Sequence, residues 1–271
     1  MRRSIVSFLG KRCPWLLRLF LQRKWQREIE QASTSGEYIS DPDQLVHFTD
    51  YERSNLSRHI PLIFHQTWRT SLVPQFWRSN RDAVTRLHPS PPWEHRLWTD
   101  DEIASFVQEH FPHYWQAFQL LPKPIMRIDM FRYMVLSVYG GVYADLDFRL
   151  FKAVDDLIAD CTLLIPAESD NPAYHSFCGQ YFLASCAGHP LWEDCLKACL
   201  DRPEQEILAY DDPLEATGPA FVTSVWRRNP DKYRAKIPMR VFLGPPSSYW
   251  YSGISPPALS YGIHQCHGTW R

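Results

Sequence analysis

Two carboxylates, Asp145 and Asp147, lie one residue apart inside the otherwise apolar stretch YGGVYADLDF. The stretch predicts a strand in which alternate side chains share a face, so both carboxylates point the same way. Two unpaired carboxylates side by side repel each other and lose hydration when they are buried. A divalent cation, Mn²⁺ or Mg²⁺, at this strand end would resolve the conflict and would in turn neutralise a diphosphate. Ion pairs with Arg132 or Arg149 are the structural alternative.

A second pair of charged residues, Asp129 and Arg132, precedes these carboxylates. Their segment, LPKPIMRIDMFRYMVLSVYGG, predicts a long helix, with Pro124 suited to its first turn and Gly140 to its stop. The i, i+3 spacing puts the two charges on one helix face. Aspartate is unfavourable inside a helix, so Asp129 is expected to be a paired or functional carboxylate. A surface ion pair between Asp129 and Arg132 is the alternative. An apolar stripe marks another side of the helix: Phe131, Met134, Val135 and Val138.

Strand and helix patterns alternate around these residues. Residues 62–64 predict a first strand, and WEHRLW predicts a second strand that runs into a helix capped near Thr99 or Asp100. VYADLDF and CTLLIP predict two more strands. This alternation favours the α/β class with a mostly parallel central sheet. Ligands of such sheets bind beyond the carboxyl ends of the strands, where the two aspartates are expected.

Six motifs follow one another in the order IPLIFHQTWRT, WEHRLWTDDE, RIDMFRY, YGGVYADLDF, EATGPA and HQCHGTW. Together they resemble glycosyltransferase family 32, a D-x-D family with mannosyl inositolphosphorylceramide synthase subunits, yeast-type α-mannosyltransferases and bacterial capsular polysaccharide enzymes. The resemblance covers Ile60 to Arg271. It implies a GT-A-type nucleotide-sugar-binding domain with helices flanking the sheet. It also implies metal-dependent, retaining transfer of a hexose, with mannose the first choice, to a hydroxyl of a glycan or glycolipid acceptor.

The resemblance implies roles for the charged residues at matching positions. Asp147 would ligate the metal directly, whereas Asp145 would contact the donor ribose and sugar or reach the metal through water. Asp129 would bind hydroxyls of the donor sugar, and Arg132 would contact the sugar or a phosphate. The predicted catalytic residues are therefore Asp129, Arg132 and Asp145, and no protein nucleophile is evident.

The motif HQCHGTW near the end of the chain implies the last metal ligand. His264 matches the leading histidine of the family pattern, so the predicted metal group is Asp145, Asp147 and His264. Neutral imidazole suits Mn²⁺ alongside carboxylates. His267 is the alternative to His264, and Trp270 is expected to cover the diphosphate.

Further contacts are predicted with the nucleotide sugar, which is GDP-mannose or a UDP-hexose: His65, Gln66, Thr67, Trp68, Tyr133 and Gly218. Trp68 would stack on the base, with a plain core role as the alternative. Gly218 would let the backbone approach donor or acceptor closely. The family often has an asparagine near CGQYFLAS, where this chain has Gly179 and Gln180, so no acceptor or catalytic role is assigned there.

The N-terminal segment differs from the rest of the chain. Residues 1–27 contain eight Lys and Arg and no acidic residue, and no apolar run in them is long enough for a membrane-spanning helix. Residues 1–30 therefore predict a basic amphipathic helix on an anionic membrane surface, and the alternatives are a helix packed on the protein or a disordered leader. We expect a linker over 31–58, a catalytic domain over 59–271, and a protein in the cytoplasm or on the cytoplasmic face of a membrane, since no signal peptide is clear.

Overall composition excludes some functions. The net charge of −1 over 271 residues does not favour a nucleic-acid partner. The seven cysteines contain no Cys-x-x-Cys pair and are expected to be reduced, mostly buried thiols. Two other readings remain open. One is a non-catalytic sugar-nucleotide-binding or membrane-adaptor protein. The other is a haloacid-dehalogenase-like phosphatase. Such phosphatases usually have Thr or Val two residues after the second aspartate of D-x-D, where this chain has Arg149, so this interpretation is disfavoured.

Overall fold

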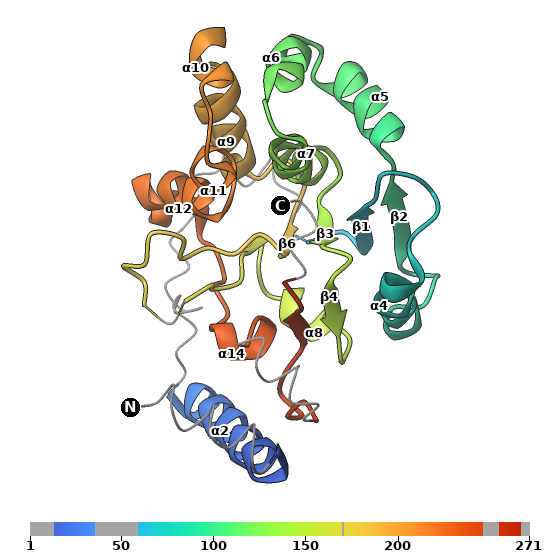
Figure 1. Cartoon of the computed structure of the whole chain (residues 1–271), viewed down its shortest axis with the longest axis vertical. Coiled ribbons are helices and arrows are strands. Elements are labelled where there is room, and N and C mark those ends of the chain that lie inside the picture. Colours follow the sequence, from blue (N-terminus) through green and yellow to red (C-terminus); the bar gives the residue numbers. More distant parts are fainter. Residues whose placement is uncertain (1–13, 36–58, 170, 246–254, 267–271) are drawn as a thin grey trace.

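The computed structural model describes residues 14–35, 59–169, 171–245 and 255–266. Its strands are β1 (Ile63–Thr67), β2 (Glu94–Trp98), β3 (Gly141–Ala144), β4 (Phe148–Leu150), β5 (Leu163–Leu164), β6 (Phe182–Ser185) and β7 (Gly262–His264). A five-stranded sheet has the order β2-β1-β3-β6-β5, and β4 pairs with β7 in a separate two-stranded sheet (Figure 1). β1 is parallel to β2 and β3, whereas β6 is antiparallel to β3 and β5. Because only β6 opposes the other strands of the sheet, the predicted α/β class with a mostly parallel sheet is confirmed.

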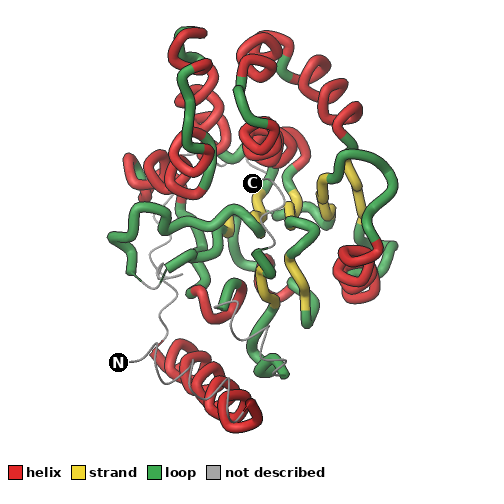
Figure 2. The backbone as a smooth tube through the Cα atoms, in the orientation of Figure 1, coloured by secondary structure: helices red, strands yellow, loops and turns green. Residues whose placement is uncertain are grey.

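Helices cover both sides of the sheet (Figure 2). They are α2 (Pro14–Ser35), α4 (Gln75–Leu87), α5 (Asp100–His110), α6 (Trp115–Leu120), α7 (Pro124–Tyr139), α8 (Asp155–Ile158), α9 (Pro190–Leu200), α10 (Glu204–Leu208), α11 (Pro213–Ala216), α12 (Pro219–Arg228), α13 (Pro230–Tyr233) and α14 (Arg240–Leu243), with a 3₁₀ turn at Pro112–Tyr114. Helices α5, α6, α7, α9 and α12 share one apolar cluster with the sheet, and α2, α8 and α14 share a second cluster. The fold is thus a helix–sheet–helix sandwich.

Alternation along β3 divides its side chains between the two layers. Tyr143 belongs to the cluster with α7 and α9, and its neighbours Val142 and Ala144 belong to the cluster with α2 and α14. None of the three is measurably exposed. A strand buried on both faces has no solvent side, so polar groups become accessible only where the strand ends.

The helix that carries Asp129 and Arg132 begins and ends at the two predicted signals. α7 begins with Pro124 at its first position and ends at Gly140, whose φ of 64° lies in the region that favours glycine. A Cβ on Gly140 would lie 2.6 Å from the backbone nitrogen of Ala187, so close packing also requires glycine there. The predicted start of α5 is confirmed as well, because Thr99 and Glu102 form a capping box.

Two predicted strands have other bounds in the structure. β1 runs from Ile63 to Thr67 rather than over 62–64, so the residues expected after it belong to the strand itself. The expected strand VYADLDF is also wrong, because β3 ends at Ala144 and a turn follows, closed by the Phe148 N–H donating to the Asp145 carbonyl oxygen at 2.9 Å. From Phe148 onward the chain pairs with β7, which comes from the far end of the chain.

The N-terminal helix α2 packs on the rest of the protein along one side. Leu21, Trp25 and Ile29 are spaced four residues apart and are buried in the cluster with α14. The Trp25 indole N–H donates to the carbonyl oxygen of Val241 at 3.3 Å. Residues 1–13 of the predicted N-terminal helix, and the predicted linker beyond residue 35, lie outside the described residues. No helix in the described part of the chain is both long enough and apolar enough to cross a bilayer.

Candidate active site

A cavity of about 1090 Å³ opens where β1 and β3 end. Its walls come from the segment after β1, helices α5, α6 and α7, the turn after β3, the starts of α11 and α12, and the end of β7. This volume lies just above the usual range for small-molecule sites, so it has room for a ligand with several parts. Eight of the predicted site residues line it: Thr67, Trp68, Asp129, Arg132, Asp145, Asp147, Gly218 and His264.

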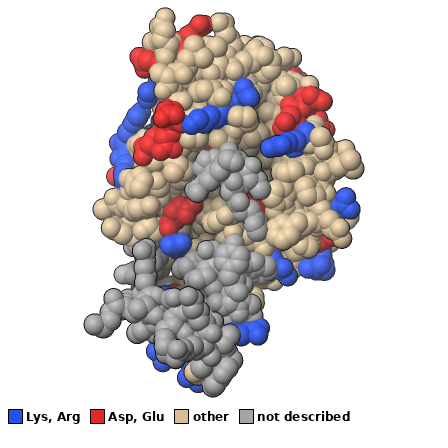
Figure 3. All heavy atoms as spheres, viewed as in Figure 1, with Lys and Arg blue, Asp and Glu red and all other residues tan. Residues whose placement is uncertain are grey.

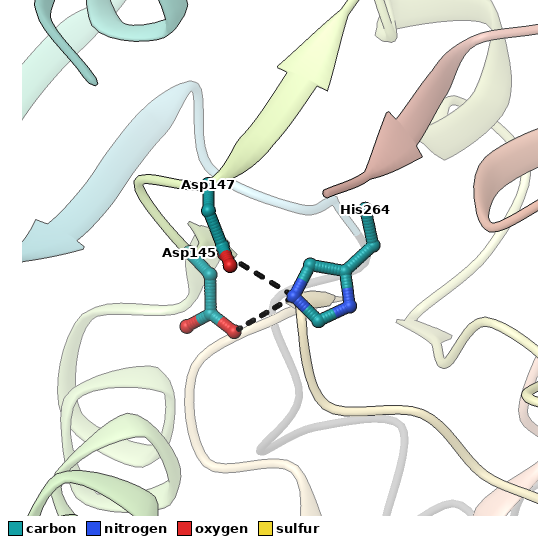
Figure 4. Close-up of side chains that lie close together, drawn as sticks. All are labelled: Asp145, Asp147 and His264. Atoms are coloured by element: carbon teal, nitrogen blue, oxygen red, sulfur yellow. Dashed lines mark hydrogen bonds and ion pairs between the residues drawn. The ribbon is translucent and has the colours of Figure 1, made fainter. Parts of the chain in front are cut away.

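Asp145, Asp147 and His264 converge in this cavity (Figure 4). His264 Nε2 lies 3.2 Å from Asp147 Oδ1 and 4.0 Å from Asp145 Oδ2. One ligand atom from each of the three residues lies within 4.8 Å of the others. Two carboxylates and an imidazole are hard and borderline donors that suit Mn²⁺ or Mg²⁺. The residues therefore fit a divalent cation.

The pairing of β4 with β7 brings the histidine to the two aspartates. Phe148 lies opposite His264 in this pairing, and the Gln265 N–H donates to the Asp147 carbonyl oxygen at 3.0 Å. The Tyr181 ring stacks on the imidazole with 4.7 Å between ring centroids. The imidazole is thus fixed on one side by a ring and on the other by the carboxylates.

Charge and burial act in opposite directions on His264. Burial lowers the pKa of the imidazole, but the hydrogen bonds with Asp147 and Cys266 outweigh it and raise the pKa well above the usual value. Burial also raises the pKa of Asp145, against the opposing effect of Arg132. Positive charge beside Asp145, from Arg132 and His264, therefore favours its carboxylate form against the cost of burial.

Asp129 and Arg132 form a buried ion pair at the floor of the cavity. Arg132 Nη2 lies 3.1 Å from Asp129 Oδ1 and 3.7 Å from Asp145 Oδ1, and the paired side chains of Asp129 and Arg132 are each 5% exposed. Thr217 Oγ1 donates to Asp129 Oδ2 at 2.8 Å, and Arg132 Nη1 donates to the Gln180 carbonyl oxygen at 3.0 Å. Burial raises the pKa of Asp129 to about 6, although Arg132 and Thr217 oppose the rise. The alternative of a surface ion pair is excluded.

Tyr143 connects the Asp129–Arg132 ion pair with the candidate metal ligands, which are Asp145, Asp147 and His264. Its hydroxyl donates to Asp145 Oδ1 at 3.2 Å and lies 3.0 Å from Thr67 Oγ1. The Arg132 guanidinium carbon lies 4.9 Å from the centroid of its ring. Tyr143 is fully buried in β3, so it holds Asp145 and Arg132 in a fixed relation to the sheet.

Three predicted donor contacts do not line the cavity: His65, Gln66 and Tyr133. His65 is fully buried, its Nε2 lies 2.9 Å from the Gly140 carbonyl oxygen, and its Nδ1 accepts from the Trp98 indole. Burial lowers the pKa of His65 to about 4, so the ring is neutral and both nitrogens are engaged. These contacts tie β1 to the end of α7, and the predicted donor contact of His65 gains no support from the lining of the cavity. Gln66 is likewise buried.

Tyr133 supports the site from behind. Its hydroxyl donates to the carbonyl oxygen of Thr217 at 2.8 Å and accepts a hydrogen bond from Gln180 Nε2. It therefore positions Thr217, the residue that donates to Asp129. The other predicted contact at the end of the chain, Trp270, lies outside the described residues, as does His267.

Gly218 lines the cavity, but its neighbours give a further reason for glycine. It precedes α12, and a Cβ there would lie 2.8 Å from Leu214 Cα and from the Pro213 carbonyl oxygen. Close packing of the chain against α11 therefore excludes any side chain at this position.

Sequence reasoning missed several residues of the cavity. Gln180, which received no role, lines it and accepts from Arg132 through its backbone. Glu168 also lines it, and burial raises the pKa of its carboxyl group. Asn80 lies behind the turn and donates to the Leu146 carbonyl oxygen at 2.9 Å, between the two aspartates. Neither Glu168 nor Asn80 belongs to a motif with recognisable spacing, so no sequence signal pointed to them.

Comparisons with known proteins agree with this geometry. Residues 74–164 match the family model described as "Glycosyltransferase sugar-binding region containing DXD motif". These residues are therefore similar to the sugar-binding region of D-x-D glycosyltransferases, and the resemblance found in the sequence is confirmed.

Two similar proteins come from yeasts. The chain is 32% identical over 169 residues to mannosyl phosphorylinositol ceramide synthase SUR1 of Saccharomyces cerevisiae, covering 62% of this chain and 42% of that protein. It is 30% identical over 190 residues to inositol phosphoceramide mannosyltransferase 2 of Schizosaccharomyces pombe, covering 70% of this chain and 50% of that protein. The chain thus spans half or less of the length of these relatives. A solved structure, PaToxG glycosyltransferase, has 15% identity and a TM-score of 0.46 over 79% of this chain and 80% of that one.

Proposed function

We propose that this protein is a metal-dependent, retaining mannosyltransferase that moves mannose from GDP-mannose to a hydroxyl of a glycolipid or glycan. One observation carries the proposal: Asp145, Asp147, His264 and the buried Asp129–Arg132 pair meet in one cavity. The activities named for the two yeast relatives support mannose as the sugar and an inositol-containing sphingolipid as acceptor.

Asp145, Asp147 and His264 would hold Mn²⁺ or Mg²⁺. When bound, the cation supplies positive charge that neutralises the diphosphate of the donor. Asp147 Oδ1 and His264 Nε2 already lie within 3.2 Å of each other, so they would need little rearrangement to share a ligand. Asp145 takes part in both groups, because Arg132 also lies 3.7 Å from it.

The Asp129–Arg132 pair would bind the donor sugar and the departing phosphate. Asp129 accepts from Thr217 and from Arg132, which leaves lone pairs for sugar hydroxyls at the cavity side. Arg132 remains charged throughout, and its position beside Asp145 directs that charge to the part of the cavity where a diphosphate would lie. Burial strengthens both interactions, since little water competes with them.

In the proposed reaction the bond between the anomeric carbon and the diphosphate oxygen breaks, and a bond from that carbon to the acceptor oxygen forms. The acceptor hydroxyl attacks from the side of the leaving group through an oxocarbenium-like state, and its proton passes to the departing diphosphate. Arg132 stabilises the negative charge that develops on that leaving group. Attack on the same face retains the anomeric configuration.

Trp68 lies at the nucleotide end of the proposed donor site. It lines the cavity next to Thr67, and its ring meets Trp77 edge-on with 4.6 Å between centroids. A base could stack on the ring of Trp68.

We also propose that residues 59–271 form the catalytic domain and that the protein acts at the cytoplasmic face of a membrane.

The phosphatase and the non-catalytic readings are not favoured. The family match is to a glycosyltransferase sugar-binding region, and it includes Asp129, Arg132, Asp145 and Asp147. These side chains lie together in a cavity rather than scattered over the surface.

Release of free nucleoside diphosphate from a panel of nucleotide sugars with Mn²⁺ tests the proposal. We expect GDP-mannose to be used in preference to UDP-glucose, UDP-galactose and UDP-N-acetylglucosamine, and EDTA or Asp147→Ala to abolish release. Asp231→Ala, at an exposed position on α13, is the matched control and should leave release unchanged. Full activity in EDTA and in Asp147→Ala would rule out the metal group, and hydrolysis of simple phosphate esters instead would favour the phosphatase.

A further inference from the structure

The segment between β1 and α4, with the first turn of α4, exposes two large apolar side chains. Leu72 is 75% exposed and Phe76 is 61% exposed, the highest values for large hydrophobic side chains in the described part of the chain. We call residues 69–78 the rim. In Figure 1 its loop arcs outside β2 at the edge of the molecule, and the high exposure of Leu72 and Phe76 means that these side chains protrude rather than line a groove.

Positive charge accompanies these apolar residues. Arg69 and Arg78 are exposed, and neither forms an ion pair with any residue that the structure describes. The sequence has no acidic residue between His65 and Asp82. Lys and Arg side chains gather over α4 at this edge of the molecule (Figure 3). Residues 69–78 themselves therefore combine exposed apolar side chains with positive charge and no acidic side chain, and the nearby acidic residue Asp100 contacts Arg69 through its backbone N–H.

The rim is held firmly in place. Val73 and Trp77 are buried and pack on Leu146, which lies between Asp145 and Asp147 in the sequence. The backbone N–H of Trp77 donates to the Pro74 carbonyl oxygen at 2.9 Å, and the side-chain Nε of Arg78 donates to the Val73 carbonyl oxygen at 2.9 Å. Leu72 and Phe76 are thus exposed on a backbone segment that packing and hydrogen bonds hold in place.

The rim also borders the cavity. Trp68, Arg69 and Trp77 line the cavity wall, and Leu72 and Phe76 follow in the same turn on the outer side. A molecule that contacts the rim therefore lies next to one wall of the cavity.

We propose that the rim docks on the interface of an anionic lipid bilayer, with Leu72 and Phe76 inserted among the headgroups and Arg69 and Arg78 against acidic lipids. A bilayer accepts a small convex protrusion without matching its shape, and arginines favour its negative surface. Two side chains offer too little area for a stable contact with a second copy or another protein, which needs about 800 Å² on each partner. If the proposed function holds, docking would present a lipid-linked acceptor to the cavity.

Co-sedimentation with vesicles tests the proposal. The full chain is mixed with vesicles of phosphatidylcholine alone or with about 30% phosphatidylserine, at low and high salt. We expect binding only to the anionic vesicles. Replacing Arg69 or Arg78 by a neutral residue should weaken binding to the anionic vesicles about fivefold. High salt should weaken this binding further. Leu72→Ser/Phe76→Ser should weaken it about tenfold, because both inserted side chains are lost.

Matched variants separate the rim from other surfaces. Leu208→Ser/Leu259→Ser changes two other exposed apolar side chains, 55% and 44% exposed, and should bind like the unchanged protein. Leu19→Ser/Phe20→Ser changes the outward side of α2 and should weaken binding less than the rim variant does. Unaltered vesicle binding by Leu72→Ser/Phe76→Ser, or no binding by the unchanged protein, would overturn the proposal. So would concentration-dependent dimers that the rim variant abolishes, because they would assign the rim to a second copy.

Release of GDP from GDP-mannose without vesicles keeps the two proposals apart. Leu72 and Phe76 do not line the cavity, so the rim variant should release GDP at the unchanged rate and show the same thermal unfolding midpoint. Loss of vesicle binding with intact GDP release supports the rim. Intact vesicle binding without any GDP release would contradict the proposed function alone.

Discussion

Replacing Arg132 by methionine removes the positive charge that neutralises Asp129 inside the protein. The guanidinium lies 3.1 Å from the Asp129 carboxylate, and both side chains are 5% exposed, so water cannot take its place. Breaking such a pair from one side usually destabilises a protein by about 3–5 kcal/mol. Thr217 still donates to Asp129 at 2.8 Å, so we expect a loss near the lower end, about 3 kcal/mol in the free energy of unfolding at neutral pH.

The loss in Arg132→Met depends on pH in a defined direction. Burial already raises the pKa of Asp129 to about 6 in the folded protein, above its value in the unfolded chain, and loss of Arg132 raises it further. The folded state then binds the Asp129 proton more tightly than the unfolded state does. The contribution of Asp129 to the variant's stability is therefore most favourable below its unfolded pKa of about 4, and it is lost as the pH rises through the raised folded pKa, so the deficit grows over that range.

Urea unfolding followed by tryptophan fluorescence measures both effects. Arg86→Met, at an exposed position near the end of α4, is the control and should change the free energy of unfolding by less than about 0.5 kcal/mol. Asp129→Asn/Arg132→Met removes both charges of the buried pair and should be more stable than Arg132→Met alone. A loss below about 1 kcal/mol in Arg132→Met, or a deficit that shrinks as the pH rises, would refute this account of the pair.

Three further predictions concern other residues of the site. Protonation of Asp129 removes an acceptor for sugar hydroxyls, so kcat/KM for GDP release should fall as the pH drops below about 6, and a flat profile down to pH 5 would contradict the assignment. Tyr143→Phe removes the hydroxyl that donates to Asp145, so kcat/KM should fall about tenfold with a stability loss of about 1 kcal/mol, and unchanged kinetics would count against this positioning role. Gly218→Ala places a Cβ 2.8 Å from Leu214 Cα, so thermal unfolding should show a loss of about 1–3 kcal/mol, and a neutral outcome would mean that α11 yields readily.

Local signals in the sequence predicted the elements whose bounds depend on neighbouring residues. α7 begins and ends as expected because Pro124 fits a first helical turn and Gly140 adopts a positive φ. The start of α5 follows from the Thr99–Glu102 capping box, which is also a local feature. The convergence of Asp145 and Asp147 was expected too, although the reason given was a continuous strand.

Long-range contacts account for what the sequence did not predict. β3 ends at Ala144 because the next segment pairs with β7, and no periodicity within VYADLDF reveals a partner more than 100 residues away. The same holds for His65, which has the residue type of a ligand but is buried between Trp98 and Gly140. His264 could be matched to its site only through the family resemblance, since its contact with Asp147 spans 117 residues.

The central claim is that Asp145, Asp147 and His264 hold a divalent cation needed to bind the nucleotide-sugar donor. Calorimetric titration of GDP-mannose into the protein, with Mn²⁺ and then with EDTA, tests it most directly. We predict measurable binding with Mn²⁺, at least about tenfold weaker binding in EDTA, and the same weakening in Asp147→Ala and in His264→Ala even with Mn²⁺ present. Equal affinity with Mn²⁺ and EDTA, or unaltered Mn²⁺-dependent binding in both variants, would contradict the account.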